Sequence, residues 1–139
     1  MTSISLGITG ARKKNGKLWT GDEHYNEFKT ALLEWIATNG MPDKMISGGA
    51  VGADTHARRF AEEHDIEFVE HLPYKHLRSP QKFYRRNEDI VNDSTHIVAF
   101  PSDIYGRDWE YTRGGTQWTM RYAMKQGVEM HIFWVEDLV

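Results

Sequence analysis

Three glycines lie close together in the segment Ser47–Asp54, which reads SGGAVGAD and separates a short apolar run from a helical pattern. Glycine has no Cβ, so backbone N–H groups in such a turn can approach an anion closely. A helix that begins beside the turn adds unpaired N–H groups and a partial positive charge. The spacing matches neither the dinucleotide-binding GxGxxG pattern nor a Walker A loop. We predict a phosphate site, with a purely structural turn as the alternative, formed by Ser47, Gly48, Gly49, Gly52 and Asp54.

Three further segments carry groups that suit an anionic ligand. The first follows an apolar run, where a glycine permits close approach and an arginine can bind phosphate or carboxylate through two parallel hydrogen bonds. The second places an arginine and an asparagine in a helical pattern, although asparagine is a poor helix former. The third opens a helix with two glycines and a hydroxyl donor. For each segment the alternative is an ordinary turn, helix cap or surface. The residues are Gly10 and Arg12 in the first segment, Arg86 and Asn87 in the second, and Gly114, Gly115 and Thr116 in the third.

The elements that must position these segments follow from hydrophobic periodicity. It predicts strands at 3–9, 44–47, 66–72, 95–100 and 129–135, and helices at 22–38, 52–64, 80–93 and 116–126. Asp22 is the predicted N-cap of the first helix, and Gly127 the glycine that ends the last. Alternating strands and helices predict a single Rossmann-like α/β domain over 1–139. It is a three-layer sandwich with a mostly parallel sheet of about five strands and helices on both faces.

In such a sheet ligands bind beyond the carboxyl ends of the strands. This rule places the functional residues in the turns 9–17, 47–54, 73–87 and 101–116. The net charge is −3, yet basic residues gather in two of these turns, at 12–17 and 75–86. Local basic clusters on a mildly acidic chain favour a small anionic ligand over a long polyanion, with a solvated surface as the alternative.

Composition excludes several other classes. The 139 residues suffice for one domain, and the absence of cysteine excludes disulfides and thiolate sites. The seven histidines show no metal-binding spacing, so we expect neither a metal nor a cofactor. We expect no signal peptide and no membrane span, and therefore a cytoplasmic protein. The loop 102–113 is rich in aromatic residues and arginine, which favours either a lid that stacks on a base or a dimer contact.

Four blocks, in order, resemble the SLOG superfamily of Rossmann-like domains, which contains DNA-processing protein A and the Lonely Guy phosphoribohydrolases. The blocks are GITGAR at 7–12, SGGAVGADTHA at 47–57, RNEDIV at 86–91, and GGT at 114–116 with Ala123 and Gly127. The second and third are most similar to the DNA-processing branch and to small stand-alone SLOG domains of phages and bacteria. The resemblance implies a nucleotide-type ligand at the strand ends, and a homodimer or higher homo-oligomer.

One departure from the family pattern concerns catalysis. The phosphoribohydrolases carry a glutamate shortly after the last glycine turn, whereas residues 113–121 read RGGTQWTMR. N-glycosidic hydrolysis needs a carboxylate near the ribose, and the alternative candidates here are Glu88, Asp54 and Glu110. We therefore expect a protein that binds a nucleotide or a nucleotide-derived small molecule, as a sensor or a sequestering protein. The alternatives are a phosphoribohydrolase-like enzyme and a single-stranded DNA-binding protein.

Overall fold

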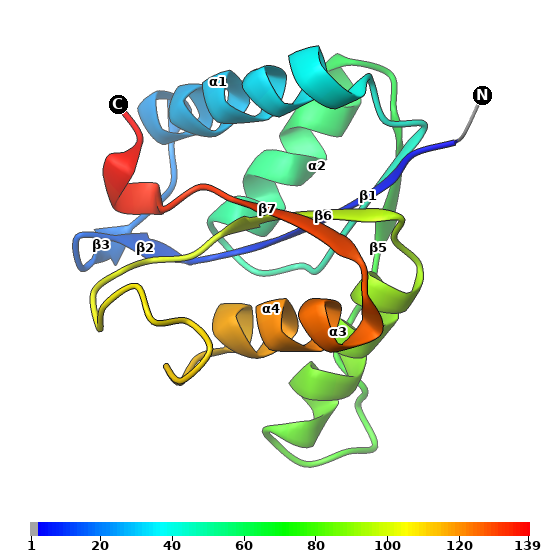
Figure 1. Ribbon diagram of the computed structural model, residues 1–139, viewed down its shortest axis with the longest axis vertical. Coiled ribbons are helices and arrows are strands. Elements are labelled where there is room, and N and C mark those ends of the chain that lie inside the picture. The colour runs from blue at the N-terminus through cyan, green and yellow to red at the C-terminus, as the bar shows by residue number, and fades with distance from the viewer. Residues whose placement is uncertain (1–2) are drawn as a thin grey trace.

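The computed structural model describes residues 3–139 and forms one parallel sheet with helices on both faces. Figure 1 shows α1 and α2 on one face of the sheet and α3 and α4 on the other. The predicted three-layer α/β architecture is thus confirmed. The strand order is β5-β4-β1-β6-β7, with every neighbouring pair parallel. The strands are β1 (Ser5–Gly10), β4 (Lys44–Ser47), β5 (Glu67–Glu70), β6 (His96–Phe100) and β7 (Glu129–Ile132), and the helices are α1 (Asp22–Asn39), α2 (Ala53–Glu63), α3 (Gln81–Asn92) and α4 (Gly115–Gln126).

The main core lies between the sheet and the α1–α2 layer. The apolar residues at helical spacing in α1 turn inward, so Phe28 and Leu32 are fully buried. In α2 the small residues Ala53 and Ala57 let the helix lie close to the sheet, and Phe60 fills the space beside them. Burial of these stripes, rather than helix propensity alone, holds both helices against the strands.

The strand order reverses direction between β1 and β6, which are neighbours in register from Leu6↔His96 to Gly10↔Phe100. The chain leaves β1 for α1 on one face and leaves β6 for α4 on the opposite face (Figure 1). The two connections therefore diverge, and they open a crevice beyond the carboxyl ends of these strands. In open α/β sheets this switch point is where ligands bind.

A small hairpin after β1 was not predicted from periodicity. Strands β2 (Lys13–Lys14) and β3 (Lys17–Leu18) pair antiparallel around Asn15-Gly16. Both turn residues have positive φ, which is typical of a tight two-residue hairpin with this sequence. The hairpin returns the chain so that Trp19 enters the core, where it is fully buried.

Several predicted boundaries were wrong, among them the strand 66–72, of which only Glu67–Glu70 forms β5. Two further errors concern β7 and α1. The predicted strand 129–135 ends at Ile132, because its neighbour β6 ends before Pro101, and the chain continues into a short 3₁₀ helix, η1 (Val135–Asp137). Asp22 is the first residue of α1 rather than its N-cap, since Gly21 holds that position without a side-chain cap. The Asp22 carboxylate pairs instead with Arg59. Gly127 does end α4 as predicted, and it has a left-handed conformation. No helix within 3–139 has the length and apolar character needed to cross a membrane.

Candidate ligand-binding site

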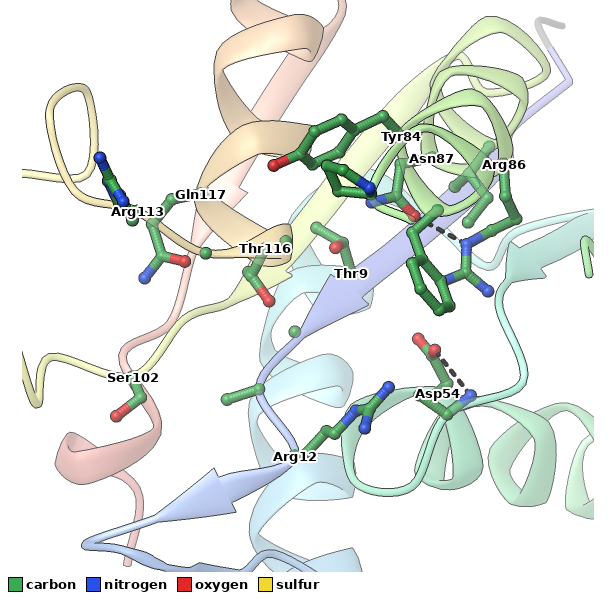
Figure 2. Close-up of a pocket in the computed structure, with 18 of the residues that line it drawn as sticks. Thr9, Arg12, Asp54, Tyr84, Arg86, Asn87, Ser102, Arg113, Thr116 and Gln117 are labelled. Carbon is green, nitrogen blue, oxygen red and sulfur yellow. Dashed lines mark hydrogen bonds between the residues drawn. The ribbon is translucent and has the colours of Figure 1, made fainter. Parts of the chain in front are cut away.

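A cavity of about 480 Å³ opens at the switch point. All four strand-end segments contribute to it: the end of β1, the turn before α2, the start of α3, and the chain between β6 and α4. The volume is in the range of small-molecule and cofactor sites. Figure 2 shows side chains from these segments converging on a common space.

Arg86 is the most distinctive polar residue of the cavity. Its side chain is buried, with the residue only 8% exposed, and it comes from α3. Its Nε donates to the Asn87 side-chain oxygen at 2.8 Å, and Nη1 donates to the carbonyl of His71 at 3.3 Å. Across residues 3–139 it forms no ion pair with a carboxylate. The Asp54 carboxylate acts on Arg86 without a direct ion pair, so the guanidinium keeps the capacity to bind an anionic ligand directly.

Burial and nearby charges together lower the pKa of Arg86. Burial lowers the pKa of Arg86, the Asp54 carboxylate raises it, and Arg12 lowers it further. In Figure 2 the Asp54 side chain lies between the guanidinium groups of Arg12 and Arg86. Arg12 is exposed at the cavity rim, in contrast to Arg86. The two arginines thus offer one fixed and one accessible cationic group at the same end of the cavity.

Asp54 binds the donors of its own turn. Its Oδ2 accepts from the backbone N–H of Ala50 at 3.1 Å, and the N–H of Gly48 also bonds to the carboxylate. Oδ1 lies 2.6 Å from the Ser47 hydroxyl. Burial raises the pKa of Asp54, an effect that these hydrogen bonds and Arg86 oppose. The amides that the sequence assigned to a phosphate are therefore directed to a carboxylate within the protein.

The glycines of this turn allow close packing. A Cβ on Gly48 would lie 2.5 Å from Arg86 Nη1 and 2.9 Å from Asp54 Oδ2. Gly52 has a φ of 89°, and a Cβ there would lie 2.4 Å from the carbonyl oxygen of Ala11. That carbonyl accepts the N–H of Ala53, the first residue of α2. The turn is thereby joined to the segment that carries Arg12.

The N-terminus of α4 supplies backbone donors on the other side of the cavity. Gly114 holds the N-cap position without a side-chain cap, and the first intrahelical bond runs from the N–H of Trp118 to the Gly114 carbonyl. The N–H groups of Gly115, Thr116 and Gln117 therefore precede the helical ladder. All three residues line the cavity, where their N–H groups and the helix dipole favour an anion.

An apolar wall completes the cavity. Phe83, Tyr84 and Ile90 come from α3, at spacings that place them near Asn87 on one side of the helix. Tyr84 stacks on Trp118 of α4, with ring centroids 4.6 Å apart and planes 10° from parallel. The Asn87 side-chain oxygen accepts the hydrogen bond from Arg86, so the Asn87 side-chain nitrogen is the group that can donate to a ligand. The cavity therefore combines cationic groups and amide donors with an aromatic surface.

The structure places the predicted site residues in two groups. Those that line the cavity are Gly10, Arg12, Asp54, Arg86, Asn87, Gly114, Gly115 and Thr116. Ser47, Gly48, Gly49 and Gly52 lie behind it, where they shape the turn that carries Asp54. Of the proposed carboxylates, only Asp54 lines the cavity. Glu88 lies beside Arg85 at 3.5 Å, and Glu110 is exposed in the loop before α4.

Several lining residues were not identified from the sequence. Thr9, Phe83 and Ser102 lie within the predicted turns but were not named as site residues, and Gln117 lies one residue beyond the last of these turns. Phe83 precedes Arg86 by one helical turn, and Gln117 lies in the first turn of α4, so the helical period around the predicted residues was the available signal. Within residues 3–139 no cluster of three or more His, Cys, Asp or Glu side chains could hold a metal ion.

Comparison of the chain with family models and with curated proteins returns no match.

Proposed function

We propose that this protein binds a nucleotide or a nucleotide-derived small molecule in the switch-point cavity. The observation that carries the proposal is the buried Arg86, which no carboxylate pairs within the described chain and which shares one cavity with the N-terminus of α4 and an aromatic wall. An anionic group would bind Arg86 and the N-terminus of α4, and a ring system would pack against the aromatic wall.

The charge of the cavity supports an anionic ligand. Its lining has three arginines, Arg12, Arg86 and Arg113, against the single carboxyl group of Asp54, although the whole chain carries a net charge of −3. Asp54 is also committed to Ser47 and the amides of its own turn. Phosphate is the anion that arginines and helix N-termini jointly favour.

The resemblance to SLOG domains supports the same class of ligand, and the absence of the family glutamate after Gly115 favours binding over turnover. A sensor or a sequestering protein fits these features. We further propose that the protein is cytoplasmic and that it self-associates; the resemblance supports the self-association.

The proposal is tested by thermal denaturation and calorimetry with 5′-mononucleotides, cyclic nucleotides and ADP-ribose. At least one should raise the melting temperature, because a ligand that binds only the folded state stabilises it. Arg12→Gln should weaken binding about tenfold or more through loss of a charged contact. Arg85→Gln is the matched control, since Arg85 is exposed on α3 and outside the cavity. A folded protein that no compound stabilises would refute the proposal.

The same samples separate binding from the two alternative activities. Free base released from mononucleotides, and lost in Asp54→Asn, would indicate a hydrolase. A shift of short single-stranded oligonucleotides with steep salt dependence, exceeding the response to mononucleotides, would indicate a DNA-binding protein. We expect neither.

A further inference from the structure

The turn between Ser102 and Arg107 is fastened at its first end to the C-terminal 3₁₀ helix. Glu136 accepts the Ser102 hydroxyl at 2.9 Å and the backbone N–H of Asp103 at 2.7 Å. The Ser102 hydroxyl oxygen also lies 3.3 Å from the N–H of Ile104. One carboxylate thus fixes the residues that enter the turn.

The second end is fastened through Arg107. Its guanidinium donates to both carboxylate oxygens of Asp137, at 3.0 and 2.6 Å, and to Asp103 at 2.9 Å. It also lies over the ring of Trp134, 5.3 Å from the centroid. The turn closes on itself where the N–H of Gly106 donates to the carbonyl of Asp103 at 2.8 Å. A turn held by hydrogen bonds to Glu136 at one end and by ion pairs of Arg107 at the other has its apex positioned before a ligand binds.

The apex of this braced turn carries two large side chains that border the cavity. Ile104 and Tyr105 are 60% and 81% exposed, yet both belong to the cavity lining. Because the Ile104 and Tyr105 side chains remain largely exposed, they gain little hydrophobic stabilisation from folding. Both residues face the same cavity as Phe83 and Tyr84 of α3. Fixing an aromatic surface in advance lowers the ordering cost of binding a planar group.

We infer that Tyr105 is a specificity-determining residue that covers the planar ring of the ligand, so that the site takes a compound bearing a nucleobase rather than a sugar phosphate. This inference rests on the function proposed above. Aromatic stacking accepts every base, because each has a π face. The anion end of the cavity then fixes the phosphate, and Tyr105 distinguishes ligands that carry a ring from those that do not.

The test compares AMP, GMP, CMP and UMP with ribose 5-phosphate by calorimetry on the full chain. Tyr105→Ala should weaken binding of the tightest mononucleotide roughly fivefold or more, while leaving ribose 5-phosphate unchanged. Tyr105→Phe, which keeps the ring, should restore the wild-type affinity. Tyr111→Ala is the matched control, since Tyr111 is 82% exposed in the same loop and outside the cavity lining.

Two results would overturn the inference and leave the proposed function intact. One is a wild-type protein that binds ribose 5-phosphate as tightly as the mononucleotides. The other is a Tyr105→Ala variant that binds mononucleotides unchanged, or loses both kinds of compound equally. If the folded wild-type protein binds none of these compounds and nothing else on the nucleotide panel, the proposed function and this inference both fail.

Discussion

The Ser47 hydroxyl lies 2.6 Å from Asp54 Oδ1 and 3.0 Å from the carbonyl oxygen of Ile8. These contacts join β4, α2 and β1 at one point behind the cavity. The Ser47 hydroxyl has one proton and cannot donate it fully to both oxygens. An ionised Asp54 therefore competes with the Ile8 carbonyl for this hydrogen bond.

Ser47→Ala should lower the free energy of unfolding by about 1–3 kcal/mol, because it leaves a partly buried carboxylate without one of its donors. Urea denaturation measures the change. Ser79→Ala is the control, since Ser79 is exposed, and it should shift stability by less than about 0.5 kcal/mol. Equal stability of the Ser47 variant and the wild type would contradict the role given to this contact.

Gly52→Ala should lower the free energy of unfolding by about 3 kcal/mol or more. This loss is larger than the positive φ alone would cause. The added Cβ would lie 2.4 Å from the carbonyl oxygen of Ala11, which is backbone and cannot move aside cheaply. Gly16→Ala separates the two effects, because Gly16 has a similar φ of 79° and open space around it. Similar losses of stability in the two variants would show that the close approach of Gly52 to Ala11 does not affect stability.

Gly115→Pro tests the backbone donors of α4. Proline is tolerated at the first helical position, where no intrahelical bond is lost, so the melting temperature should stay within a few degrees of wild type. Nucleotide binding should weaken, because one N–H that faces the cavity is removed. Gly115→Ala retains that N–H and has open space for its Cβ, so it should bind as the wild type does. If both variants bind equally well, the amide of residue 115 does not contact the ligand.

Arg107→Gln should reproduce the selective effect expected of Tyr105→Ala, because it releases the turn from Asp137 without altering a lining residue. Calorimetry should show weaker mononucleotide binding and unchanged ribose 5-phosphate binding. Arg58→Gln is a suitable control, since its ion pair with Glu70 also lies on the surface but away from the turn. Full mononucleotide affinity in the Arg107 variant would show that the brace does not set the position of Tyr105.

His56 should make the protein less stable in acid. It is buried against Trp19, whose carbonyl lies 2.9 Å from Nε2, and burial lowers the pKa of His56 below 6.5. As the pH falls below about 6.5 the unfolded chain binds a proton that the folded chain does not, so the free energy of unfolding decreases. Urea denaturation between pH 7.5 and 5.5 should show a smaller slope for His56→Gln than for wild type. His76→Gln, at an exposed position, should retain the wild-type slope.

Local sequence patterns alone determine the helices, the parallel sheet and the edge at which ligands bind. The apolar periods of 22–38 and 52–64 identify helices, since only one face of each can be buried. The alternation of strands and helices implies the parallel sheet, and the glycine-rich strand ends mark the edge where ligands bind. Asn15-Gly16 is a hairpin signal that periodicity alone overlooks, because two-residue strands are too short to show a period.

Tertiary structure alone decided how the candidate site is assembled. The Ser47 hydroxyl reaches the carbonyl of Ile8, 39 residues earlier, only because β4 pairs with β1 in the sheet. Arg86 meets the start of α4 only because the chain crosses the sheet between β5 and β6. Glu136 and Asp137 brace a turn some thirty residues earlier in the chain, since β7 ends beside β6. These contacts are long-range, and their energy depends on which elements become neighbours when the sheet forms.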